Sequence, residues 1–142
     1  MFDFYSDTKT KPTMAMRAAT LSAVVGDEQK DEDPTTLELC ERVAALLDKE
    51  SAVFLPSGTM CNEIAIRVHT NPGDEVIISD PYFVIYKHVI SMLGGKCVYI
   101  NTYPDFRLGA DKVEAAITEK TKLIILNSPA NPTGIVYTEA EI

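Results

Sequence analysis

The sequence has few of the residues that build metal sites or disulfide frameworks. Its two histidines, His69 and His88, are isolated, and its three cysteines are odd in number, far apart and without a C-x-x-C pair: Cys40, Cys61 and Cys97. Scattered thiols in an odd number are typical of a reduced protein. No group of His, Cys and carboxylate residues has metal-ligand spacing, and the acidic run before Pro34 lacks the glycine of a calcium-binding turn. We therefore predict no disulfide and no metal site.

Basic stripes and long apolar runs are also missing. The formal net charge is −8, and no basic stripe is present that could neutralise the phosphates of a nucleic acid, so we predict no nucleic-acid partner. No apolar run approaches the roughly 20 residues that span a bilayer. Asp3, Asp7, Lys9 and Lys11 lie where a secretory signal would need an apolar core. We predict no membrane partner and a cytoplasmic location.

The 142 residues are enough for one domain with a core, and 46% of them are hydrophobic. Short apolar runs alternate with helical patterns. We predict strands at residues 52–55, 75–79, 96–101 and 122–127, with helices at 13–24, 60–69, 81–93 and 110–118, and two more helices capped by Asp33 (followed by Pro34) and Thr138. Continuous apolar strands indicate a parallel sheet covered on both faces. The prediction is an α/β fold of three αβα layers, with 1–33 as an arm and acidic loop and 34–142 as the domain.

Spacing also predicts which side chains face the core. On the helix after Asp33 these are Leu37, Cys40, Val43, Ala44 and Leu47, and on the helix of residues 60–69 they are Ile64, Ala65 and Val68. Residues 122–127 are almost wholly apolar, which predicts a central strand.

Residues 52–59, AVFLPSGT, carry the first sign of a binding site. A strand that turns through Ser57, Gly58 and Thr59 into a helix leaves backbone N–H groups unpaired at the positive end of the helix dipole. Together with the two hydroxyls, these donors would suit a phosphate. On this segment alone, an ordinary N-cap is an equally good interpretation.

Two more segments follow predicted strands, DPYF at 80–83 and NPTG at 131–134. In open parallel sheets, ligands bind beyond the carboxyl ends of the strands. The predicted phosphate site, the aromatic side chains of DPYF and the amide of Asn131 would then lie along the same edge of the sheet. Together they would suit a flat, aromatic, phosphorylated cofactor.

These residues carry a resemblance to pyridoxal-phosphate enzymes of fold type I. From residue 2 to about residue 77 the chain resembles low-specificity threonine aldolases and related β-eliminating lyases, through SDTKTKP (6–12), VGDE (25–28), EDPT (32–35) and FLPSGTMCN (54–62). From about residue 73 onward it resembles class I/II aminotransferases, through GDEVI (73–77), DPYF (80–83), AAIT (115–118) and NSPANPTG (127–134). The resemblance implies the N-terminal portion of a large cofactor-binding domain.

The resemblance also implies residue roles. Gly58 and Thr59, next to Ser57, would hold the phosphate of pyridoxal 5'-phosphate, Phe83 would stack on its ring, and Asn131 would hydrogen-bond its phenolic oxygen. Ser6 matches the aldolase residue that contacts the carboxylate of an amino-acid substrate. The assembly that the resemblance implies is a homo-oligomer, specifically a homodimer.

Two departures keep the function open. Both families join the cofactor to a lysine as a Schiff base, and no lysine of this sequence lies in the matching context, so no catalytic residue is identified. Phe83 stands where threonine aldolases carry a histidine. The resemblance implies a threonine-aldolase-type lyase that cleaves β-hydroxy-amino acids. The alternatives are an aminotransferase and a catalytically inactive fragment.

Overall fold

The computed structural model describes residue 3 and residues 5–142, and for Asp7 the backbone alone. The chain forms two compact units, Met1–Phe54 and Leu55–Ile142. The sequence suggested a different division, after residue 33, and that functional division remains a prediction. Among the described residues, no helix is both long and apolar enough to cross a membrane.

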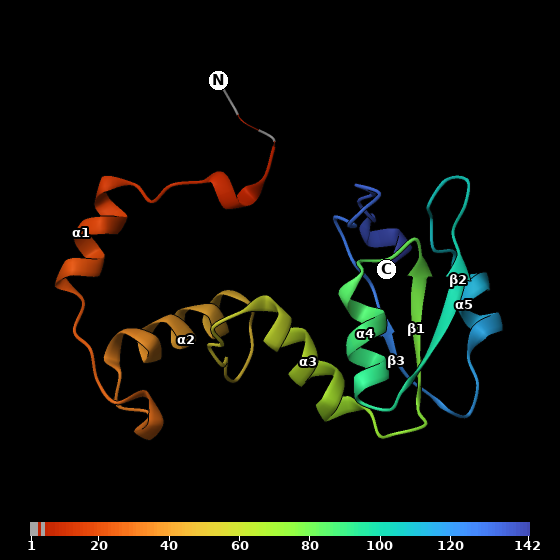
Figure 1. Cartoon of the computed structure of the whole chain (residues 1–142), viewed down its shortest axis with the longest axis horizontal. Coiled ribbons are helices and arrows are strands. Elements are labelled where there is room, and N and C mark those ends of the chain that lie inside the picture. Colours follow the sequence, from red (N-terminus) through yellow and green to blue (C-terminus); the bar gives the residue numbers. More distant parts are fainter. Residues whose placement is uncertain (1–2, 4) are drawn as a thin grey trace. The chain divides into compact units, whose positions relative to one another are not determined.

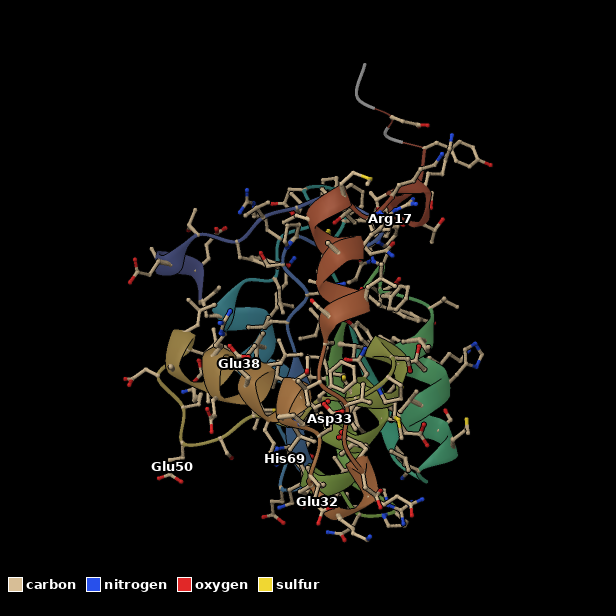
Figure 2. The ribbon with its side chains drawn as sticks, turned by 90° about the vertical axis from the view of Figure 1, so that its left-hand side faces the viewer. Arg17, Glu32, Asp33, Glu38, Glu50 and His69 are labelled. Atoms are coloured by element: carbon tan, nitrogen blue, oxygen red, sulfur yellow. The ribbon has the colours of Figure 1, made fainter. Side chains whose placement is uncertain are left out.

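The first unit contains η1 (Asp7–Lys9), α1 (Met14–Ser22), η2 (Glu28–Lys30) and α2 (Pro34–Leu46). Thr13 caps α1 by accepting a hydrogen bond from the Met16 N–H at 3.2 Å. Asp33 caps α2, accepting from the Thr36 N–H at 2.8 Å, and its other carboxylate oxygen accepts from the Gly26 N–H at 2.8 Å. Figure 2 labels Asp33 at the start of α2 and Glu38 further along it. Both helices predicted in this part of the chain are confirmed.

The predicted core face of α2 is largely wrong. Ala44 is buried and Cys40 is half-buried, but Leu37, Val43 and Leu47 are exposed. Residues 52–55 do not form a strand, and Val53 is 79% exposed. The spacing of apolar residues predicts which face of a helix is apolar, but that face is buried only if another element packs against it. In the same way, an apolar run forms a strand only if a neighbouring strand accepts its backbone hydrogen bonds.

The second unit is a three-stranded parallel sheet with helices on its faces (Figure 1). Its strands are β1 (Glu75–Asp80), β2 (Lys96–Asn101) and β3 (Thr121–Ile125), in the order β2-β1-β3. Both pairings are parallel, with Glu75 opposite Lys96 and Thr121. The helices are α3 (Gly58–His69), α4 (Ile85–Met92) and α5 (Ala110–Ala116).

Side chains of β1 alternate between two clusters on opposite faces of the sheet. Val76 and Ile78 pack with Ile66 of α3 and with Val89 and Ile90 of α4. On the other face, Ile77 packs with Ile100 and Leu108. Two half-buried side chains of α5, Val113 and Ala116, pack against this cluster. Helices therefore lie on both faces, and the predicted three-layer α/β architecture is confirmed.

Three details of the predicted unit need correction. The central strand is β1, not residues 122–127, because β3 pairs on one side alone among the described strands. The residue of α3 that reaches the core is Ile66, while Ile64, Ala65 and Val68 are exposed. A turn separates Pro81 from α4, which begins at Ile85.

The helix predicted after Thr138 is present as a single short 3₁₀ turn. It is η3 (Glu139–Glu141), where Thr138 and Glu141 make the expected capping box. η3 follows the loop after β3, and the capping box stabilises the backbone at the end of that loop.

Candidate functional site

The carboxyl ends of β1 and β2 are tied together by Thr102, which is 1% exposed. Its backbone N–H and its hydroxyl both donate to the Asp80 carbonyl, at 3.0 and 2.8 Å. Because Asp80 ends β1 and Thr102 follows β2, the two bonds fix the rim where the predicted ligand segments begin. Sequence patterns did not reveal this contact, since the partners are 22 residues apart.

The segment after β1 presents aromatic rings. Phe83 is half-buried, and its ring meets Tyr86 edge to face with centroids 5.6 Å apart. Tyr82 lies against Tyr99 of β2, with centroids 5.4 Å apart. Desolvation raises the pKa of the Tyr86 phenol, so this hydroxyl is neutral at physiological pH. Two aromatic ring pairs therefore follow the end of β1, and Phe83 belongs to one of them.

The loop after β3, residues 128–135, carries Asn131 and closes on itself. The Ala130 N–H donates to the Ile135 carbonyl at 2.8 Å, and the Gly134 N–H donates to the Ala130 carbonyl at 2.7 Å. Gly134 has φ +74°, a conformation that favours glycine. With the Asn127 amide oriented to satisfy both of its groups, its oxygen accepts from the Asn131 N–H at 3.2 Å. The Asn131 side chain is exposed.

The start of α3 offers the predicted phosphate donors. Ser57 is the N-cap, and its hydroxyl accepts from the Met60 N–H at 3.2 Å. The first turn of α3 is exposed, and no atom lies within 4 Å of where a Cβ on Gly58 would stand. A bulky anion therefore has room beside the Gly58 and Thr59 N–H groups.

The predicted residues are brought together in part. Phe83 and Asn131 follow neighbouring parallel strands, so both segments leave the same edge of the sheet. No hydrogen bond or ring contact within the described chain joins Ser57, Gly58 or Thr59 to either of them. Ser6 belongs to the first unit, where its hydroxyl oxygen lies 2.7 Å from that of Thr8. The binding role of each of these residues stays a prediction.

An ion pair between two loops was also not predicted from the sequence. Arg107, in the loop after β2, contacts Glu141 of η3 at 2.6 Å. Hydrogen bonds from Thr138, with a smaller contribution from Arg107, lower the pKa of the Glu141 carboxyl. The carboxylate is therefore charged at neutral pH. No local pattern relates two residues separated by 34 positions.

The donor set suits a flat, phosphorylated cofactor better than a metal. Backbone N–H groups and hydroxyls bind phosphate oxygens, an aromatic ring covers a heterocycle, and an amide donates to a ring oxygen. Among residues 3 and 5–142, no three His, Cys, Asp or Glu side chains are grouped to hold a metal ion.

A family model and several relatives match this chain. The model described as beta-eliminating lyase matches residues 3–142. The probable low-specificity L-threonine aldolase 2 of Arabidopsis thaliana is 41% identical over 147 residues, which cover 93% of this chain and 41% of that protein. An aspartate aminotransferase of Sulfurisphaera tokodaii is 43% identical over 98 residues, 66% of this chain and 25% of that protein.

Solved structures agree on the fold. The aspartate aminotransferase from Rhizobium meliloti superposes with a TM-score of 0.55 at 41% identity, covering 58% of this chain and 21% of that chain. The Thermus thermophilus aspartate aminotransferase with maleate gives 0.57 at 37% identity, over 59% and 22%. This chain therefore spans between 21% and 41% of the length of these four relatives. The expected resemblance to fold-type-I enzymes is confirmed.

Proposed function

Because the chain belongs to the beta-eliminating lyase family, we propose that it forms part of a pyridoxal-phosphate-dependent amino-acid enzyme. The reaction proposed is cleavage of β-hydroxy-amino acids by a threonine-aldolase-type lyase. The observation that carries this choice is the match to the Arabidopsis threonine aldolase over 93% of the chain at 41% identity. The aminotransferase matches cover a smaller share of the chain.

The cofactor would be held at the carboxyl edge of the sheet. The Gly58 and Thr59 N–H groups and the Ser57 and Thr59 hydroxyls would bind its phosphate, with the helix dipole favouring the negative charge. Phe83 would cover its ring. The open space around Gly58 and the exposed amide of Asn131 fit this role.

The remaining residues would orient the substrate and the ring. Pyridoxal phosphate, when bound, supplies an electron sink for bond cleavage next to the amino group of the substrate. Asn131 would donate a hydrogen bond to the phenolic oxygen, and Ser6 would bind the substrate carboxylate. We assign no residue of this chain as the catalytic lysine.

Two alternatives have their own support. An aminotransferase is favoured by the pairing of Phe83 with Asn131, the combination that the resemblance to that class implies. An inactive chain that binds the cofactor weakly through its phosphate is favoured because no lysine takes the catalytic role. We further propose a homodimer that acts in the cytoplasm, and the exposed apolar side chains Leu126 and Val136 near the rim are compatible with self-association.

The first experiment measures cofactor binding. We expect pyridoxal phosphate to bind the chain in equilibrium dialysis and inorganic phosphate to compete. Thr59→Val should weaken binding about tenfold, the effect of one hydrogen bond to a charged group. The matched control is Thr20→Val on α1, whose hydroxyl donates to the Met16 carbonyl. If Thr59→Val and the unchanged chain bind pyridoxal phosphate with equal affinity, the proposed phosphate site at the start of α3 is wrong.

A second measurement separates the alternatives. The lyase should release an aldehyde from threonine without a keto acid, whereas the aminotransferase should need one. A stoichiometric borohydride-fixed adduct on one lysine would reject the inactive alternative. No turnover and no adduct would reject both enzyme hypotheses for this chain.

A further inference from the structure

The guanidinium of Arg107 connects two loops that are distant in sequence. Its Nη1 donates to both carboxylate oxygens of Glu141, at 2.6 and 2.8 Å, and to the Val136 carbonyl at 3.3 Å. Charge-assisted hydrogen bonds of this kind are stronger than neutral ones. Arg107 thus holds both ends of the segment that runs from Val136 to η3.

Glu141 in turn fixes that segment from within. One of its carboxylate oxygens accepts from the Thr138 N–H and from the Thr138 hydroxyl, each at 2.8 Å. The Tyr137 N–H donates to the Ser128 hydroxyl at 3.0 Å. The segment from Val136 to η3 is therefore hydrogen-bonded to the start of the loop of residues 128–135, which we call the Asn131 loop.

The backbone next to Arg107 is connected to the end of β1 through Phe106 and Thr102. The Phe106 N–H donates to the Thr102 carbonyl at 2.7 Å, and buried Thr102 binds the Asp80 carbonyl twice. The Tyr137 hydroxyl also donates to the Phe106 carbonyl, at 3.4 Å. A continuous series of contacts therefore runs from the strand that precedes Phe83 to the loop that carries Asn131.

We propose that Arg107 is a positioning residue that holds the Asn131 loop at a fixed place relative to the end of β1. Among the described residues, the side-chain hydrogen bonds of Arg107 go to Val136 and Glu141 and not to Phe83 or Asn131, so it acts through those two residues and the loop closure. For its effect on cofactor binding, this inference rests on the proposed function; the restraint on the loop does not.

The test compares Arg107→Gln, which keeps hydrogen-bonding capacity but removes the charge, with Arg107→Lys, which keeps the charge. The matched control is Arg42→Gln, because Arg42 forms an exposed ion pair with Glu38 in the other unit. Amide hydrogen exchange is read at Ala130 and Gly134, whose N–H groups close the loop. Pyridoxal phosphate affinity is measured on the same proteins.

We expect Arg107→Gln to speed exchange at both amides about fivefold, the upper range for loss of an exposed ion pair, with Arg107→Lys in between and Arg42→Gln unchanged. Cofactor affinity should fall by a similar factor while the exchange of β1 amides stays constant. A general loss of stability would instead speed exchange in β1 as well.

Unchanged exchange at Ala130 and Gly134 in Arg107→Gln would overturn the inference, and so would faster exchange shared by β1. Faster loop exchange with unchanged affinity would overturn its role toward the cofactor. If the unchanged chain binds no pyridoxal phosphate, the proposed function fails, and the exchange data alone then decide whether Arg107 restrains the loop.

Discussion

Asp33 shows how one side chain fixes a local structure. Its carboxylate accepts from the Thr36 and Gly26 N–H groups, so it caps α2 and holds the preceding turn. These backbone hydrogen bonds, with that from Thr36 first, lower the pKa of Asp33 below its ordinary value of 3.8. Single polar side chains of this kind decide where the helices of the first unit begin.

The lowered pKa of Asp33 gives a pH dependence with a definite sign. A carboxyl group whose pKa falls on folding stabilises the folded state above its unfolded pKa, and that stabilisation is lost as the pH drops through its folded pKa. We expect amide exchange at Thr36, corrected for intrinsic rates, to lose protection over the pH range below the ordinary Asp33 pKa of 3.8, as the carboxylate becomes protonated.

Asp33→Asn is the matched variant for this measurement. It retains an N-cap oxygen but cannot titrate, so the corrected protection at Thr36 should no longer change over that pH range. The same pH response in Asp33→Asn and the unchanged chain would show that another group is responsible.

At the scale of the elements, a glycine ends α4 and turns the chain into β2. Gly94 has φ +79°, and a Cβ there would stand 2.9 Å from the Cβ of Pro72. Its carbonyl accepts from the Gly73 N–H at 2.8 Å, which joins this turn to the one before β1. The two turns at the amino end of the sheet therefore support each other.

Gly94→Ala should lower the free energy of unfolding by about 1–3 kcal/mol, because the left-handed backbone and the close approach to Pro72 both disfavour a Cβ. Gly58→Ala is the control for stability, since its Cβ would meet no atom within 4 Å and the backbone there is not left-handed. Urea unfolding followed by circular dichroism measures both. Equal stability of Gly94→Ala and the unchanged chain would contradict this account of the turn.

At the scale of the whole molecule, the two units differ in how much they bury. Among the described residues, Ala44 is the buried hydrophobic side chain of Met1–Phe54, whereas the second unit buries those of β1 and of both packing clusters. Local stability follows buried apolar contacts. We expect amides of β1 to exchange at least about a hundredfold more slowly than those of α1.

Ile77→Ala tests that difference directly. Removing this buried side chain should lower the free energy of unfolding of the second unit by about 2–5 kcal/mol, read from exchange of the β1 amides. Val53→Ala is the apolar control, because Val53 is 79% exposed and should change stability by no more than about 0.5 kcal/mol. A large cost for Val53→Ala would mean that this surface is covered in solution.

The sequence by itself determined the helix starts at Thr13 and Asp33, the three strands of the sheet and the αβα class. Caps, glycine turns and apolar runs act over a few residues, so local pattern contains them. It also contained the family resemblance and the segments of the candidate site.

The tertiary structure alone decided which apolar faces are buried. The exposed face of α2, the missing strand at 52–55 and the central place of β1 all depend on partners distant in sequence. The same holds for Thr102 on Asp80 and for Arg107 on Glu141, contacts across 22 and 34 residues. Non-local contacts form only when the whole sheet assembles, and no short window of sequence records them.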